Sequence, residues 1–329
     1  MRAAAHIRSA DVTRLLVLGA AASAALLLAG PAGAYGWPVK PFHRMHPIRG
    51  AFDDPRFHLG TEGALSAFHF GVDIAVKDGT PVYAVAAGHV TAHAADLTVT
   101  TRAGRGFGYW HVKPVVRTGR RVRLHQLLGH VIKGWGHVHF AESIGREYRN
   151  PLRIGALTPY RDRTPPTVAS VALVSPVSAS VDVRRVSGPV DVEAEIYDTP
   201  PRIPAPPWQV ARLTPAVIWW RLVRGDEAIG DWNVAADFSF ALMPASLYGS
   251  LYAPGTYQNK ANRPGKYLFW VVHDLDTSVL ANGRYSIEVM AMDTRWNVGT
   301  AAVSFTVSNA TQSPVELAPG IVARFRRPE

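Results

Sequence analysis

Cysteine is absent from the 329-residue chain. Its absence excludes disulfide bonds, thiolate zinc sites, a cysteine nucleophile and a lipid-anchored cysteine. The chain also lacks the G-x-S-x-G motif of a serine nucleophile elbow. Apolar runs are short, and no stretch after the first thirty residues approaches the ~20 residues that span a bilayer. Cysteine-based chemistry is therefore excluded, and serine hydrolysis has little support.

The first 34 residues are typical of an export signal. Three arginines precede an apolar run at 15–30, and small residues follow at Ala32 and Ala34. This order predicts a signal peptide over 1–34, cleaved after Ala34. An uncleaved anchor helix is the alternative, but the run is shorter than a ~20-residue span and an A-x-A site follows. We expect an exported protein, in the extracellular space, cell wall or periplasm, with no stable membrane insertion after cleavage.

The chain is basic, with a formal net charge of +10. The predicted signal holds three arginines and one aspartate, so +8 remains on the mature chain. A basic exported protein suits an anionic surface such as the bacterial cell wall. The alternative, that the charge only keeps the protein soluble, stays open. Nucleic acid is not an expected partner because no recognition motif is present.

Short alternating segments predict an all-β chain with two antiparallel domains. Segments 80–94 and 97–103 are rich in β-branched residues, and the glycine-rich 104–108 between strands predicts a turn. Proline and charge at 158–167 mark a boundary. Further strand patterns lie at 168–176, 190–198, 216–225, 266–274 and 283–307. The predicted order is a catalytic domain at 35–158, a linker at 159–167, a β-sandwich at 168–308 and a flexible tail at 309–329.

Eleven of the thirteen histidines lie between 43 and 139, so imidazole chemistry belongs to the first domain. In the segment HVHF (137–140), a strand would place His137 and His139 on one face and would point Val138 and Phe140 toward the core. An isolated H-x-H is more often a polar strand face. Upstream, His69 and Asp73 would also share a face of an extended segment. A catalytic zinc needs three nitrogen or oxygen ligands and one open position, which this set can supply.

With these histidines and this aspartate, the sequence resembles the LytM/lysostaphin-type zinc metallopeptidases, family M23. The motif H-x-x-x-D stands here as HFGVD (69–73), and H-x-H as HVH (137–139). The segments GTPVYAVAAGHV (79–90), GYWHV (108–112) and TGRRVRLHQLLGHV (118–131) also resemble that family, as does NPL (150–152) after HVHFAE. The resemblance extends over 48–158 and implies an antiparallel LytM-type fold that binds Zn²⁺.

The resemblance also implies roles for five side chains. His69, Asp73 and His139 would be the zinc ligands, while His111 and His137 would be catalytic groups beside the open position. Zinc lowers the pKa of its bound water to about 7 and polarises a carbonyl, and an imidazole can accept the proton.

Two aromatic residues are candidate substrate contacts. Tyr109 would share the face of His111 in a strand and is either a substrate contact or a packing residue. Trp135 lies in the segment 127–136, where the family has a longer loop that forms one wall of the substrate groove. The shortening makes substrate specificity uncertain. His130 lies in the same wall and is either a substrate contact or, as we expect, a plain surface residue. No matching role is expected for His89, His93 and His125.

The resemblance implies a secreted zinc endopeptidase that cuts peptide stems or cross-links of bacterial peptidoglycan. One alternative is a non-catalytic wall-binding regulator or activator of other hydrolases, and another is an adhesin that binds through the sandwich. Residues 283–307 resemble the closing strands of immunoglobulin-like or fibronectin-like modules. The long tyrosine-rich segment 247–267 predicts a contact with the catalytic domain or with the wall.

Overall fold

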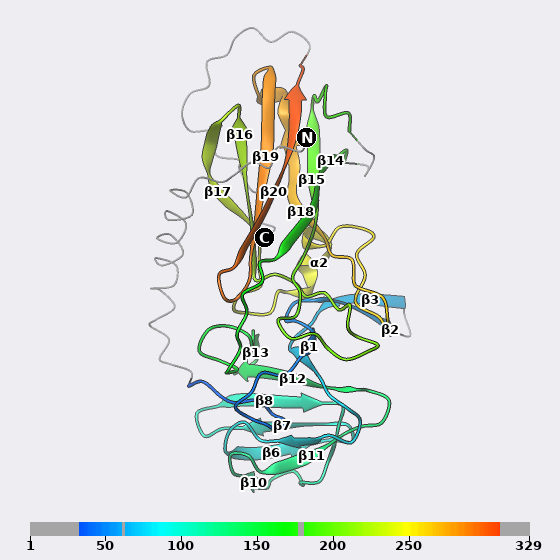
Figure 1. Cartoon of the computed structure of the whole chain (residues 1–329), viewed down its shortest axis with the longest axis vertical. Helices are drawn as coiled ribbons and strands as arrows, with labels where there is room; N and C mark the ends of the chain where they lie inside the picture. The colour runs from blue at the N-terminus through cyan, green and yellow to red at the C-terminus, as the bar shows by residue number, and fades with distance from the viewer. Residues whose placement is uncertain (1–32, 61–62, 177–180, 310–329) are drawn as a thin grey trace.

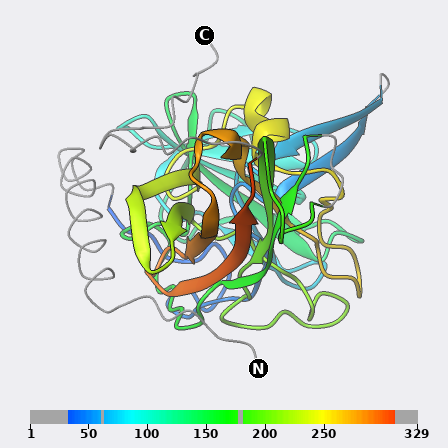
Figure 2. The ribbon, with the colours of Figure 1, turned by 90° about the horizontal axis from the view of Figure 1, so that it is seen from above.

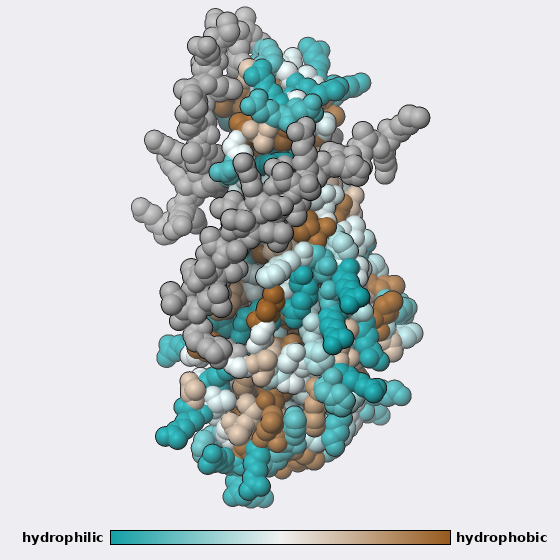
Figure 3. Space-filling view, turned by 60° about the vertical axis from the view of Figure 1, so that its left-hand side comes forward, coloured by the Kyte–Doolittle hydropathy of each residue, from teal (hydrophilic) through white to brown (hydrophobic). Residues whose placement is uncertain are grey.

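The computed structural model describes residues 33–60, 63–176 and 181–309, and within these ranges the chain is built almost entirely of antiparallel strands. The predicted all-β fold class is confirmed. Two β-rich domains lie end to end along the long axis, and their strands run in crossed directions (Figure 1). Hydrophilic residues are interspersed with apolar ones over both domains (Figure 3).

The first domain contains thirteen short strands in its described residues. They are β1 Ile48–Gly50, β2 Pro55–Gly60, β3 Gly63–Phe68, β4 Val72–Ala75, β5 Pro81–Tyr83, β6 Gly88–Ala92, β7 Asp96–Thr100, β8 Arg105–Trp110, β9 Val112–Pro114, β10 Arg121–Val122, β11 Leu127–Val131, β12 His137–Ile144 and β13 Glu147–Arg149.

The main sheet of the first domain has the order β1-β4-β12-β8-β7-β6-β10, with β13 paired to β12. A small sheet, β5-β11-β9, packs beside it, and the hairpin β2–β3 projects beyond the outline of the second domain (Figure 2). Alternating apolar residues of the main sheet form one hydrophobic core, in which Val138 and Phe140 are fully buried. The predicted inward direction of these two side chains is confirmed.

The predicted glycine turn at 104–108 is correct only at Gly104, which closes the turn between β7 and β8 with φ +78. It is wrong for 105–108, because these residues belong to β8, between β12 and β7. The glycines are there for close packing. A Cβ at Gly108 would overlap the indole of Trp110, which folds back over the strand, and one at Gly106 would lie 2.5 Å from Oγ of Ser143 on β12. Glycine is therefore required in β8 for close packing against neighbouring side chains. Composition alone does not distinguish such a glycine from one in a loop.

The second domain is a two-layer sandwich. Its strands are β14 Thr167–Val174, β15 Pro189–Tyr197, β16 Val217–Arg224, β17 Glu227–Asp237, β18 Leu268–Asp276, β19 Gly283–Met292 and β20 Val298–Val307, with short helices η1 Ala245–Leu247, α2 Tyr248–Leu251 and η2 Thr277–Val279. The sheets β14-β15-β18 and β17-β16-β19-β20 share one core. The sequence missed β17, in which only Ala236 is buried and Gly230 with Asp231 interrupts the apolar residues. The likeness to immunoglobulin-like modules stays a prediction.

Two predicted segments fall mostly outside the described residues: the signal peptide at 1–34, except for its last two residues, and the tail at 309–329, except for Asn309. Within the ranges that the structure describes, no helix has the length and apolar character needed to cross a membrane.

The two domains are joined by buried polar contacts. Asp54 accepts a hydrogen bond from the backbone N of Thr214 (2.8 Å), and Asp53 accepts one from the N of Met243 (3.1 Å). The hydroxyl of Tyr252 donates to the carbonyl of Asp53 (2.8 Å). Tyr252 belongs to the segment 247–267, so the predicted contact of that segment with the first domain is confirmed.

Three carboxylates, of Asp162, Asp198 and Asp293, meet where the linker joins the second domain, with oxygens within 4.8 Å of one another. Burial, followed by the charges of the other two, raises the pKa of Asp198 to about 8. Because its pKa is higher in the folded state than in the unfolded chain, the carboxyl of Asp198 binds its proton more tightly in the folded state. Proton binding therefore stabilises the fold at low pH, and this stabilisation is lost as the pH rises from about 4 to about 8.

Asp198→Asn should raise the melting temperature clearly at pH 8 and hardly at pH 4. Asparagine keeps the acceptor that receives the N–H of Thr199 at 2.7 Å, so geometry is preserved. Thermal unfolding over this pH range measures the effect, with Asp226→Asn in the exposed β16–β17 turn as the control for net charge. An equal shift at both pH values would contradict the raised pKa.

Candidate metal centre

The backbone brings three predicted ligands together at the pairing of β4 with β12. Asp73 on β4 lies directly opposite His139 on β12 in the antiparallel register. His69 follows the end of β3, and the chain bends at Gly71 before β4 begins. A Cβ on Gly71 would overlap the carbonyl of Phe140 and would lie 2.8 Å from Nε2 of His139. Glycine is required here because the chain passes against β12.

The prediction that His69 and Asp73 share a face of one extended segment is therefore wrong. Four residues of extended chain would separate His69 and Asp73 by about 13 Å along the strand, too far to share an ion. The bend shortens this separation until Nε2 of His69 lies 3.2 Å from Oδ1 of Asp73. The two side chains converge because the chain turns between them. They do not converge because they lie on the same face of one strand.

The three side chains present one cluster of potential ligand atoms. Nδ1 of His139 lies 3.2 Å from Oδ1 of Asp73 and 2.7 Å from Nε2 of His69. All three residues are more than nine-tenths buried. These atoms form a group that could hold a metal ion.

Neighbouring groups fix the orientation of two members of the cluster. Nδ1 of His69 donates to the carbonyl of Ala51 at 2.6 Å, which leaves Nε2 as the lone-pair atom that faces the cluster. The other oxygen of Asp73, Oδ2, accepts from the guanidinium of Arg56 at 2.9 Å. Such outer contacts are what orient the ligands of protein metal sites.

The imidazoles of the cluster are neutral at neutral pH. Burial, helped by the charge of Arg56, lowers the pKa of His69 to about 3, and burial also lowers the pKa of His139. Burial by itself would raise the pKa of Asp73, but the facing histidines and Arg56 outweigh it and hold that pKa well below its ordinary value. Neutral imidazoles and an ionised carboxylate are the forms that bind metal ions.

His137 and His111 lie beside the cluster. Nε2 of His137 is 3.4 Å from Oδ1 of Asp73, and the rings of His137 and His111 are 4.6 Å apart. His111 has φ +63, a conformation that non-glycine residues seldom adopt, and it joins β8 to β9. Burial, followed by the neighbouring His137, lowers the pKa of His111 to about 3.

Residues 67–151 match the model of Peptidase family M23. These residues form an M23 peptidase-family domain. The matched range contains the three residues of the cluster and the two histidines beside it. The candidate metal site therefore lies within the M23 domain.

Solved structures give a weaker likeness. The chain is 25% identical to a zinc-containing peptidase from Vibrio cholerae over 34% of its own length and 37% of that protein, with a TM-score of 0.27. It is 20% identical to a chain of the SpoIIQ–SpoIIIAH pore-forming complex, over 36% and 89% (TM-score 0.31), and 21% identical to Csd3 of Helicobacter pylori, over 40% and 36% (TM-score 0.31). At such scores none of them bears on activity. A comparison with curated proteins finds no match.

Tyr109 of the M23 domain is a core residue, which corrects its suggested role as a substrate contact. Its side chain is fully buried, and its hydroxyl accepts a hydrogen bond from the N of Val85 at 2.9 Å. The alternation of β8 ends at Trp110, and the positive φ of His111 turns that imidazole toward the cluster instead. Tyr109 and His111 therefore do not share a face.

Trp135 forms an exposed edge of the site. It is 46% exposed and stacks on His111, with ring centroids 3.5 Å apart. The loop that carries it is held by Asp78, whose carboxylate accepts from the N of Gly134 (2.7 Å) and of Gly136 (2.9 Å). Trp135 thus lies between the cluster and solvent, where it could contact a molecule bound at the site.

The remaining histidines of the M23 domain do not join the cluster. His125 stacks on Phe42 at 3.9 Å, and His93 pairs with Asp96 on the surface. His130 on β11 pairs with Lys113 on β9, and His89 lies on β6. None of these four is a member of the cluster of ligand atoms. That they have no role in function stays a prediction.

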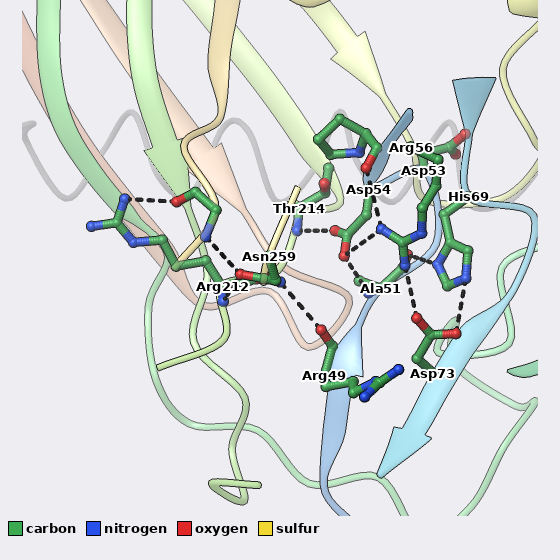
Figure 4. A network of polar contacts seen from close by, with 12 residues as sticks. Arg49, Ala51, Asp53, Asp54, Arg56, His69, Asp73, Arg212, Thr214 and Asn259 are labelled. Atoms are coloured by element: carbon green, nitrogen blue, oxygen red, sulfur yellow. Dashed lines mark hydrogen bonds and ion pairs between the residues drawn. The ribbon is translucent and has the colours of Figure 1, made fainter. Parts of the chain in front are cut away.

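Sequence reasoning missed the charged residues of β1, of the loop after it and of the start of β2. Arg49, Asp54 and Arg56 form a charged group at the edge of the cluster, and the second domain contacts it through Thr214 and Asn259 (Figure 4). The only available signal was the density of charge in PIRGAFDDPR (47–56). Its contacts lie up to 210 residues away in the chain.

Proposed function

We propose that this protein is an exported zinc-dependent endopeptidase that hydrolyses peptide bonds in the stems or cross-links of bacterial peptidoglycan. His69, Asp73 and His139 would hold the zinc ion, and His111 and His137 would be catalytic residues. Trp135 would contact the substrate.

The observation that carries this proposal is the mutual separation of the three ligand atoms. Zinc bound tetrahedrally at 2.0–2.1 Å requires ligand atoms about 3.3 Å apart. The two carboxylate–imidazole separations are both 3.2 Å, while the two imidazole nitrogens stand closer, at 2.7 Å. The donor set of two neutral imidazoles and one carboxylate also suits zinc. The residues therefore fit the ion that the family resemblance implies.

A bound zinc ion would supply Lewis acidity and a water that becomes nucleophilic near neutral pH. The chain supplies the proton transfers. His137 and His111 are neighbours on one side of the cluster, so a ring nitrogen of either that faces the scissile bond can accept a proton or donate to the developing oxyanion. Trp135 holds the His111 ring by stacking on it.

Peptidoglycan as substrate is supported by the basic charge that remains after the predicted signal, since the bacterial wall is anionic. The M23 domain is the second support. Retention of all five polar positions favours catalysis over the alternative of a non-catalytic wall-binding regulator.

Metal content and wall hydrolysis test the proposal together. The purified chain should contain about one zinc ion per molecule and should release peptide fragments from purified peptidoglycan, identified by mass spectrometry. A chelator should stop the release, and added zinc should restore it. Zinc binding and wall binding without fragments would favour the regulator, while fragments released by metal-free protein would refute the zinc site.

A further inference from the structure

Arg49 stands at a bulge beside the metal cluster. Ile48 and Gly50 on β1 pair with Ile74 and Asp73 on β4, so Arg49 is the extra residue of an irregular register. A bulge leaves its residue unpaired and re-aims the side chain, and bulges are common beside active sites. The guanidinium of Arg49 reaches His137, where Nη2 lies 2.6 Å from Nδ1.

Arg49 has no carboxylate partner among the described residues. Its neighbour Arg56 pairs with Asp73 at 2.9 Å and with Asp54 at 3.7 Å, so the charge of Arg56 is compensated. Among the described residues, the side chain of Arg49 donates to a ring nitrogen of His137 and to no carboxylate. Burial lowers its pKa to about 10, and Asp73 partly opposes this, so Arg49 is still a cation at neutral pH. A half-buried guanidinium that is bonded to no carboxylate has unused donors at the edge of the site.

The second domain holds Arg49 from two sides. The ring of Trp208 lies over the guanidinium, 3.9 Å from its central carbon. The side chain of Asn259 donates to the carbonyl of Arg49 at 3.2 Å, and Asn259 is itself fixed by the carbonyl of Arg212 at 2.7 Å and by the N of Gly265. One face of the planar fork is therefore covered by an aromatic ring from another domain, and its edge remains for a ligand.

The contact with His137 can be exchanged. Nδ1 of His137 also lies 2.8 Å from the carbonyl of Trp135. Arginine only donates and a carbonyl only accepts, so this nitrogen cannot satisfy both at once. When Arg49 turns to another acceptor, Nδ1 can carry the proton and donate to Trp135. The lone pair of His137 is then on Nε2, which faces Asp73.

We propose that Arg49, backed by Trp208 of the second domain, is a carboxylate-binding subsite that selects anionic peptides for the M23 site. The inference rests on the proposed function, because the ligand is a substrate carboxylate. A planar guanidinium binds a carboxylate through two parallel hydrogen bonds. The carboxylate is either the terminal α-carboxylate of the peptide or an acidic side chain near the scissile bond.

The test uses the full chain and one stem peptide in three forms: native, amidated at the C-terminus, and amidated on its acidic side chains. Calorimetry with metal-free protein measures binding, and chromatography with the zinc-loaded protein measures kcat/KM. The native peptide should bind about 10- to 100-fold more tightly than one of the amidated forms, as expected for charge-assisted hydrogen bonds. The amidation that removes this preference identifies which carboxylate is bound.

Arg49→Gln should reduce the preference, expressed as the ratio for native over amidated peptide, to about one. Arg49→Lys should leave part of it, because lysine keeps the charge and loses the fork. Trp208→Leu should lower it several-fold, and Arg202→Gln, which removes an exposed positive charge of the same domain, should leave it unchanged.

The ratio separates this subsite from a structural role for Arg49. A purely structural loss would lower binding of all three peptides equally and leave the ratio as in the wild type, which would overturn the proposal. Equal binding of all three by the wild type would also overturn it. A preference in binding without any hydrolysis would support the subsite and reject the proposed peptidase, whereas hydrolysis without a preference would do the reverse.

Discussion

His139→Ala should abolish both metal binding and peptide hydrolysis. The substitution removes one of three ligand atoms that stand within 3.2 Å of one another, and the two that remain cannot close a zinc site with a single open position. Loss of an outer partner of a ligand already costs about 10- to 100-fold in affinity, so loss of a ligand should exceed that. Asp73→Ala should have the same effect.

His137→Ala provides the matched comparison. The imidazole lies beside the cluster and is not one of the three proposed ligands, so most of the zinc affinity should remain while kcat falls by about 10²- to 10⁴-fold. Zinc affinity is measured by competition with a chromogenic chelator, and kcat by fragment release from purified walls. His93→Ala, on an exposed imidazole, should change neither. Peptide release by the His139→Ala protein would refute the assigned site.

The sequence predicted which residues form the cluster of ligand atoms, but not how the chain brings all of them together. Strand alternation correctly predicted that the side chains flanking His139 point to the core, because β12 is regular. The same reasoning failed for His69 and Asp73, since the bend at Gly71 depends on packing against β12, which lies some 70 residues further along the chain. Local periodicity contains no information about that contact.

Conformation at single residues explains a second group of errors. Tyr109 and His111 are two apart, and an ideal strand would place them on one face. The positive φ of His111 reverses this, and the sequence gives no sign of it, since histidine adopts this conformation only when its surroundings stabilise it. In the same way, the glycines of β8 are explained only by the indole of Trp110 and by β12.

The contribution of the second domain was the least accessible to sequence analysis. All of its strands except β17 were found, but the contacts with the first domain come from its loops, at Trp208, Thr214 and Asn259. Thr214 contacts Asp54, which binds the N of Ala51, and the carbonyl of Ala51 orients His69. The second domain is thus connected to the proposed zinc site through hydrogen bonds between residues that are distant in sequence.

A second large effect is expected at Glu142, which stabilises the sheet behind the cluster. The carboxylate is fully buried on β12 and accepts from Arg105 (2.7 Å), from Arg153 (2.6 and 2.7 Å) and from the hydroxyl of Tyr35 (2.8 Å). Glu142→Ala would leave two partly buried guanidiniums without their anion. Breaking a buried pair from one side costs about 3–5 kcal/mol. We expect the melting temperature to fall by about 10 °C or more.

The pH dependence distinguishes this loss of charge from a simple packing defect. Burial would raise the pKa of Glu142, but the hydrogen bonds and charge of Arg153 and Arg105 outweigh it and lower that pKa. The stabilisation is therefore complete above the unfolded pKa of about 4.3 and is lost as the pH falls through the lower value of the folded state. Melting curves of Glu142→Gln and wild type should approach each other below about pH 4, whereas a gap that persists there would indicate lost packing. Glu147→Gln, at a carboxylate that is 69% exposed beside Arg149, should change stability by less than about 0.5 kcal/mol at any pH, because exposed pairs contribute little.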